Sequence, residues 1–536
     1  MATIAVTAHA DGLQAKQLEV SSKRVFPPWT AWERALFRVA LLFTLQLTFP
    51  FRLLFWQRLV QIRRLHDIYG VAGSGGGISY VTLGSESGRW GLGSFANWGI
   101  ALLVAIALAG VWTWLARNSK RKEYTVAYYW LNLLTRYWVA FNILHYGYLK
   151  VYPDQMPFPS IANLHTLVGD TAAYRYYWAI IGLSTWYQVV LGCAEVLAGS
   201  LLFFRRTAAI GALLNLGILY NVAYANFAYD GGVHLLSAEI SLLAGILLIQ
   251  YVPNLYRLLI KKEDVVPDYY HPVFPQKWQR LAFSGVKIAA WILFIPLYTY
   301  SVFHHYLWTN ASKEPRAAGL EGAKGYYSVS EFKLNGKEIA YSPLDPARWQ
   351  DVTFEDYPTL TFKVNKALPI RLENGGPAVK DAEKHYELAG FAGGRTYLHY
   401  DLDEKNQTLI VQDKNADVRS RDASATGPAA TPAAVAASAR SNNGRRGGGG
   451  KKQEVKKYVW HYSRPSDTRI ILTGITPDKQ QFYAVLDRID EDQAIHIDSP
   501  IPDSAPTYGR QFYRRFPLRP KSFDGTTDTP NREEDK

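Results

Sequence analysis

Long apolar runs are confined to the first 305 residues of the chain, and shorter alternating patterns follow them. A transmembrane helix needs about 20 mostly apolar residues to cross about 30 Å of hydrocarbon. Seven runs have about this length when polar breaks are taken as their ends: 35–57, 95–116, 126–150, 176–204, 207–229, 233–252 and 283–304. The pattern therefore predicts an α-helical polytopic membrane bundle of about seven spans over residues 35–305.

The first run is the most irregular, because Arg38, Pro50 and Arg52 interrupt it. A proline and two charges favour a kinked span followed by a helix that lies at the membrane interface. Residues 1–34 contain neither a hydrophobic signal core nor a small-residue cleavage site. We therefore expect an uncleaved signal anchor preceded by a cytoplasmic N-terminal segment.

Lysine and arginine are divided unevenly between the predicted loops. Basic clusters occupy three alternate loops, 117–122, 205–206 and 257–262. The opposite loops, 70–91, 152–174 and 230–232, are poor in basic residues. Because cytoplasmic loops carry the excess of Lys and Arg, the basic loops are expected inside. With seven spans, the N-terminus lies in the cytoplasm and the C-terminal half lies outside it.

The second half of the chain alternates with a period of two residues, which is typical of strands. Examples are KEIAY, PTLTFKVN, RTYLHYDL, QTLIVQD, KYVWHYS, TRIILTGI and QQFYAVLDRID. Together with turn signals such as Asn335-Gly336, they predict an all-β extracytoplasmic domain, a barrel or a sandwich, in two parts at 310–419 and 458–516. Between these parts, residues 420–457 form an Ala, Pro and Gly-rich basic linker, and residues 517–536 are expected to be a disordered tail.

Charge and cysteine content narrow the function classes. The net charge of +13 suggests nucleic acid, but much of it lies beside apolar runs and in the linker, so we expect no nucleic-acid partner. Cys193 is the single cysteine, which excludes an internal dithiol pair. Redox chemistry would therefore need a cofactor or a partner. No HxxxH or CxxC spacing supports a metal site.

Polar side chains inside the predicted spans are the best functional signal, because each is costly at bilayer depth. The third span carries a polar face that includes Arg136, and the fourth carries Glu195 among Gln188, Gly192 and Gly199. Counted from the predicted inner ends, Arg136 and Glu195 lie at similar depth. We therefore predict an Arg136–Glu195 ion pair, with a structural role favoured over a catalytic one.

A second polar set lies near the predicted outer ends of the third, fifth and sixth spans. We predict that His145, Lys150 and Glu239 handle protons there. The cofactor-binding residues predicted around them are Asn142, Tyr146, Asn226, Asp230 and His234. A structural reading stays open for three of these: Lys150 snorkelling to the headgroups, Asp230 capping a turn and His234 lying at the interface.

Residues 126–260 resemble the DoxX-like superfamily of polytopic bacterial membrane proteins. The resemblance rests on RYWVAFNILHYGYLKVYP, GCAEVLAGSLLFFRRTAAIGALL and NVAYANFAYD. With NGKEIAY, RWQDVTF and WHYSRPSDTRIILTG, most of the chain, apart from the linker and the tail, resembles large DoxX-like proteins of Bacteroidota-type bacteria. This resemblance implies a bacterial inner-membrane protein with a periplasmic C-terminal domain. It also implies a role in a quinone-linked or other envelope redox system, with a quinone as the possible cofactor.

Two alternatives remain open at this point. The first is a non-enzymatic assembly subunit that lies in the lipid bilayer and binds other membrane or periplasmic proteins. The second follows from a more distant resemblance of Gly147 to Lys150 to the membrane domain of vitamin K-dependent carboxylases. That resemblance implies a carboxylase-like enzyme in which Lys150 acts as a base toward a reduced quinone.

Overall fold

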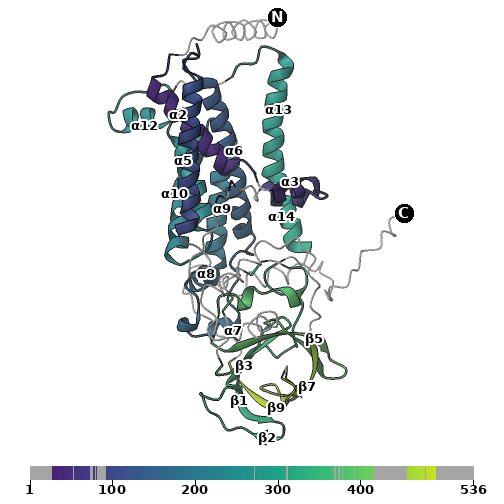
Figure 1. Ribbon diagram of the computed structural model, residues 1–536. Coiled ribbons are helices and arrows are strands. Elements are labelled where there is room, and N and C mark those ends of the chain that lie inside the picture. Colours follow the sequence, from purple (N-terminus) through teal and green to yellow (C-terminus); the bar gives the residue numbers. More distant parts are fainter. Residues whose placement is uncertain are drawn as a thin grey trace, which may run out of the picture.

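The computed structural model places a helical bundle at one end of the molecule and a β-barrel at the other (Figure 1). The structure describes residues 27–51, 53–72, 77–78, 80, 92–267, 269–270, 272–308, 312–366, 370–371, 375–376, 378–391, 393–415, 456–476 and 478–490. The predicted N-terminal segment up to residue 26, the linker core and the tail lie outside these residues.

The bundle begins with α2 (Ala31–Thr48), α3 (Leu53–Val60), α4 (Leu65–Ala72), α5 (Leu92–Leu115) and α6 (Thr125–Val151). It continues through α7 (Ile161–Leu164), α8 (Ala173–Leu183), α9 (Thr185–Leu201), α10 (Ala208–Ala228) and α11 (His234–Leu248). The last helices are α12 (Val252–Leu259), α13 (Lys277–Phe294) and α14 (Pro296–Trp308).

Several of these helices are apolar and long enough to span a membrane, which is typical of a membrane protein. Three stretches qualify outright: Phe95–Leu115, Ala208–Ala228 and Lys277–Trp308. Up to five qualify if each of two bent pairs, α8 with α9 and α11 with α12, counts as one span. The predicted runs at 35–57 and 126–150 are helical too, but α2 is short and α6 carries many polar side chains. The prediction of a helical half with several apolar helices is thus confirmed, whereas three to five helices qualify as spans, not seven.

The predicted fourth span is not one straight helix. The chain bends by 97° between α8 and α9, at Ser184. The segment after α6 packs into this bend: Gln188 accepts a hydrogen bond from Met156 N at 2.9 Å and donates one to Met156 O at 3.1 Å. A Cβ on Gly182 would lie 2.6 Å from the carbonyl oxygen of Pro157, so this close approach needs glycine. The polar side chain of Gln188 therefore holds the loop and is not part of an intramembrane site.

The C-terminal half is an eight-stranded antiparallel barrel. Its strands are β1 (Gly325–Leu334), β3 (Asp351–Phe354), β4 (Thr359–Lys363), β5 (Arg395–Asp403), β6 (Thr408–Asp413), β7 (Lys457–Ser466), β8 (Arg469–Ile475) and β9 (Gln481–Asp490). Successive strands are neighbours, and pairing of β9 with β1 closes the ring. The prediction of a barrel or a sandwich is therefore resolved as an up-and-down barrel.

Large aromatic side chains fill the barrel. Trp349 stacks on Phe362 with ring centroids 4.2 Å apart, and it also contacts Trp460 and Phe482. The short strand β2 (Lys337–Glu338) pairs only with β1, across the turn at Asn335-Gly336. Both turn residues have positive φ, at 50° and 78°, as the Asn-Gly signal predicts for a tight hairpin.

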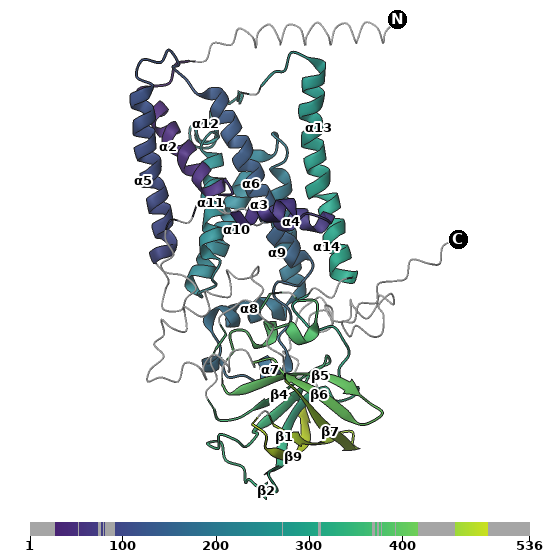
Figure 2. The same cartoon turned by 45° about the vertical axis from the view of Figure 1, so that its right-hand side comes forward.

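The loop between α6 and α8 docks onto the barrel (Figure 2). The carboxylate of Glu355, which follows β3, accepts hydrogen bonds from the backbone N–H groups of Ile161 and Ala162 at the start of α7. The Asn163 amide donates to Glu387 O and Tyr397 Oη. The Arg175 guanidinium lies 3.5 Å from the centre of the Tyr386 ring. The barrel is therefore fastened to the bundle through buried polar contacts.

We expect Glu355→Ala to loosen this docking. The two buried N–H groups would lose their acceptor, at about 1–3 kcal/mol each. Hydrogen exchange of the Ile161 and Ala162 amides should accelerate, while exchange within the barrel strands stays slow. Glu338→Ala, which removes an exposed carboxylate on β2, is the matched control. It should change neither the exchange of these two amides nor the exchange within the barrel strands. Unchanged protection of both amides in Glu355→Ala would show that other contacts hold the loop.

Candidate functional site

Helices α6 and α9 pack closely because glycines line their contact. A Cβ on Gly192 would lie 2.6 Å from Val151 N and 2.7 Å from Gly147 O, and a Cβ on Gly147 would lie 2.9 Å from Val196 Cγ2. Small residues of this kind let the backbones of membrane helices approach one another. The approach brings Lys150 Nζ within 2.8 Å of Glu195 Oε2, and both side chains are more than nine-tenths buried.

This ion pair corrects the prediction that Glu195 pairs with Arg136. The prediction treated residues 176–204 as one straight span and so placed Glu195 too far from the barrel. In the structure Gly192 is level with Lys150, and Gly199 is level with Ile143 and Leu144. Arg136 lies in the N-terminal half of α6, toward the bundle end away from the barrel. Its guanidinium instead lies over the Tyr137 ring, 5.7 Å from the centroid.

His145 points to another helix and forms a different pair. Its Nδ1 lies 2.8 Å from the phenolic oxygen of Tyr298 on α14. Tyr298 in turn stacks on Tyr69 of α4, with centroids 3.8 Å apart. Farther along α6, Tyr148 Oη lies 2.7 Å from Thr299 Oγ1. The structure thus joins α4, α6 and α14 through a buried cluster of one imidazole and three phenols.

Two further histidines extend this cluster. The rings of His66 on α4 and His305 on α14 are stacked at 4.1 Å. Ser301 Oγ lies 3.4 Å from His66 Nδ1. Tyr298, His66 and His305 were not among the site residues predicted from the sequence. One signal in the sequence could have identified the residues on α14. It is the spacing of Phe294, Tyr298, Ser301 and His305, which places these side chains on one helix face.

The other residues of the predicted site are distributed over α6, α10, α11 and the turn between α10 and α11. The amides of Asn142 and Asn226 donate to carbonyls of their own helices, Trp138 O and Val222 O. Tyr146 contacts the neighbouring His145 ring. Asp230 has a positive φ of 53° in the turn after α10, and His234 is buried beside Phe95 and Phe227. Glu239 is also buried, on α11. His145 and Lys150 therefore bind partners from outside the predicted set.

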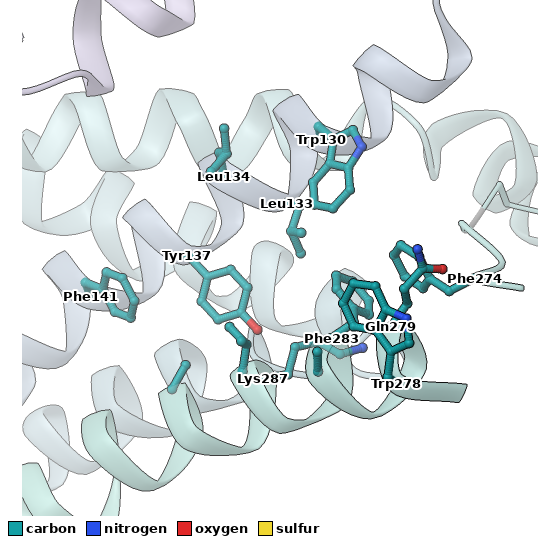
Figure 3. Close-up of a pocket in the computed structure, with 13 residues that line it drawn as sticks. Trp130, Leu133, Leu134, Tyr137, Phe141, Phe274, Trp278, Gln279, Phe283 and Lys287 are labelled. Atoms are coloured by element: carbon teal, nitrogen blue, oxygen red, sulfur yellow. The ribbon is translucent and has the colours of Figure 1, made fainter. Parts of the chain in front are cut away.

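A groove of about 600 Å³ separates α6 from α13 (Figure 3). On α6 it is lined by Trp130, Leu133, Leu134, Tyr137 and Phe141, and on the other side by Phe274, Trp278, Gln279, Ala282, Phe283, Val286, Lys287 and Ala290. At its inner end the Phe141 ring stacks on Phe294 at 3.9 Å. His145 and Tyr298 follow one helical turn beyond this stack. The groove and the His145–Tyr298 pair therefore lie along the same helix contact.

Buried lysines occupy the junction of bundle and barrel. Lys313 Nζ donates to Gln155 O at 2.7 Å and lies over the rings of Trp178 and Tyr386. Lys384 Nζ pairs with Asp381 Oδ1 at 2.8 Å. Burial lowers the pKa of both lysines to about 8. The cavity beside Lys313 holds only about 10 Å³, which is too small for a substrate, so these groups serve docking.

Metal binding has no support in the part of the chain that the structure describes. No three His, Cys, Asp or Glu side chains there are grouped so as to hold an ion. Cys193 is exposed on α9.

Comparison with known proteins finds an uncharacterized bacterial relative. No family model and no solved structure matches the chain. The uncharacterized protein YwoB of Bacillus subtilis is 33% identical over 114 residues, which cover 21% of this chain and 71% of YwoB. The DoxX-like resemblance stays a prediction. Through this segment, the chain belongs to the same family as YwoB of Bacillus subtilis.

Proposed function

We propose that the chain is a DoxX-like bacterial inner-membrane subunit of a quinone-linked redox system. The observation that supports this is the arrangement of α6 beside α13 and α14. An apolar groove lies between α6 and α13, and the His145–Tyr298 hydrogen bond follows one turn beyond the groove's inner end. A hydrophobic ring compound could enter from the bilayer through such a groove, and it would reach the buried proton donor and acceptor when the Phe141–Phe294 stack opens.

The chemistry of a quinone fits these groups. Reduction to a quinol takes up two electrons and two protons, so a buried site needs a route for protons. Tyr298 can donate its phenolic proton to a quinone oxygen, and His145 can return a proton to the phenolate through Nδ1 as its Nε2 takes another up from outside the pair. Repeated once, this relay delivers the two protons of the quinol. The chain has one cysteine and so no dithiol of its own. The electrons would come from a partner protein of the envelope.

The predicted role of Lys150 becomes less favoured in this proposal. A base must reach its substrate, whereas the Lys150 amine is more than nine-tenths buried in the contact of α6 with α9 and donates a hydrogen bond to Glu195 at 2.8 Å. The carboxylase-like alternative, which depends on Lys150 as a base, is weakened for the same reason. We assign proton handling to His145 and Tyr298, and a structural role to Lys150.

We also propose the seven-span topology, with a cytoplasmic N-terminus and a periplasmic barrel. The arrangement of the basic loops supports it. The connection from α5 to α6 and the region of α12 lie at the bundle end away from the barrel (Figure 2). Basic residues 117–122 and 257–262 belong to these two regions. An excess of Lys and Arg marks the cytoplasmic side.

Tyr298→Phe tests the redox proposal. The protein would be purified in mild detergent, its lipids extracted, and reduction of an added quinone followed in membranes that contain its partners. We expect quinone to copurify, and Tyr298→Phe to lower the reduction rate by roughly 10²-fold or more, since general acid catalysis contributes about 10²–10⁴-fold. Tyr300→Phe, on the same helix but exposed, is the control and should leave the rate unchanged.

Two results would count against the proposal. One is the repeated absence of quinone from well-folded preparations. The other is a wild-type reduction rate in Tyr298→Phe. If partner proteins copurified stably in either case, a non-enzymatic assembly subunit would become the better explanation.

A further inference from the structure

Three cationic side chains from different elements lie within electrostatic range of one another near the groove. Arg136 lies on α6, Arg205 in the turn after α9, and Lys287 on α13, where it lines the groove. Arg136 and Arg205 are both close enough to repel the Lys287 ammonium electrostatically. Figure 3 shows Lys287 beside Tyr137, which points from α6 toward α13. The fold thus places three positive charges near enough to repel one another.

No carboxylate offsets these charges in the part of the chain that the structure covers. Arg136, Arg205 and Lys287 form no ion pair with any described residue. The Nε of Arg136 is buried and has no hydrogen-bond partner there. A buried guanidinium N–H without an acceptor is costly, and more so beside two other cations. The arrangement is therefore complementary to an anion.

The surroundings indicate what kind of anion it is. The groove wall beside these cations is apolar and aromatic, with Trp130, Trp278 and Phe283 among its residues. Trp and Tyr combined with Lys and Arg are typical of the layer where lipid headgroups meet hydrocarbon. Basic pockets between membrane helices on the cytoplasmic side bind anionic lipid headgroups. A water-soluble anion would make no favourable contact with the long apolar wall, whereas an acyl chain would.

We propose that the groove between α6 and α13 is a binding site for an acidic phospholipid of the bilayer. The lipid phosphate lies among Arg136, Arg205 and Lys287, and one acyl chain lies along the apolar wall. This site shares the groove with the route proposed for the quinone, but its cations lie apart from the His145–Tyr298 pair. The cations lie about two helical turns from His145 along α6, beyond the Phe141–Phe294 stack. It would stand even if no quinone bound.

Lipid binding to the full chain tests this inference. The protein would be purified in detergent, and native mass spectrometry would count bound phosphatidylglycerol and phosphatidylcholine molecules with identical acyl chains. We expect phosphatidylglycerol to be preferred. Lys287→Gln and Arg205→Gln should each weaken its binding about fivefold, the effect of one basic residue near an anionic lipid. Phosphatidylcholine binding should not change.

Lys277→Gln is the matched control. It removes the same charge from the same helix, but Lys277 is exposed and does not line the groove. Equal binding of the two lipids would overturn the inference. So would a Lys277→Gln effect as large as that of Lys287→Gln, because it would mean a diffuse surface charge. Arg205 is exposed, so Arg205→Gln keeps the test valid if Lys287→Gln does not fold.

Discussion

Lys150→Met is expected to destabilise the bundle by about 3–5 kcal/mol, because it leaves the Glu195 carboxylate buried without its cation. Both side chains are more than nine-tenths buried inside the contact between α6 and α9, which approach closely at Gly147 and Gly192. Glu195→Met should cost a similar amount, since it leaves an unpaired ammonium. The midpoint of unfolding by SDS in mixed micelles would measure both losses.

The double variant Lys150→Met with Glu195→Met separates the pair from its members. Replacing a buried ion pair by apolar groups of similar volume is often nearly neutral. We therefore expect the double variant to be more stable than either single variant, which gives a large coupling energy in the cycle. Lys277→Met, at an exposed position, should stay within about 0.5 kcal/mol of the wild type. Additive losses in the double variant would mean that the two groups are not paired.

The division of the chain into an apolar helical half and a β half could be predicted from sequence because it depends on local pattern. Apolar run length and period-two alternation are properties of neighbouring residues. The tight turn at Asn335-Gly336 was predictable for the same reason. Closure of the barrel by β1 with β9 was not, because that pairing joins residues at opposite ends of the β half, such as Tyr327 and Arg488.

The site was harder to predict because it depends on helix register. Lys150 and Glu195 were both recognised as polar residues in the membrane, but Glu195 was assigned to Arg136. The bend at Ser184 shifts α9 relative to α6, and this bend is held by contacts of Gln188 and Gly182 with the loop after α6. Such contacts cannot be seen in a hydropathy pattern. Tyr298 was missed because an aromatic residue in an apolar helix ordinarily belongs to the core.

Gly192→Ala is expected to disrupt the same helix contact without changing any charge. The added Cβ would lie within 2.8 Å of three atoms of α6, and two of these, Val151 N and Gly147 O, belong to the backbone. Backbone atoms cannot turn aside as a flexible side chain can, so α6 and α9 must separate. Overpacking of this kind costs about 1–3 kcal/mol by itself.

Separation of the two helices would also lengthen the Lys150–Glu195 ion pair. We therefore expect Gly192→Ala to lower the free energy of unfolding by more than the cost of overpacking alone, about 1–3 kcal/mol. Gly110→Ala on α5 is the matched control, because a Cβ at Gly110 would meet no neighbouring atom within 4 Å. There the substitution should be neutral or stabilise the helix by about 0.5–1 kcal/mol. In the background of the Lys150→Met and Glu195→Met double variant, Gly192→Ala should lose its electrostatic part and keep only the steric one. An unchanged penalty in that background would show that α6 and α9 are held by packing alone and that the ion pair adapts to their separation.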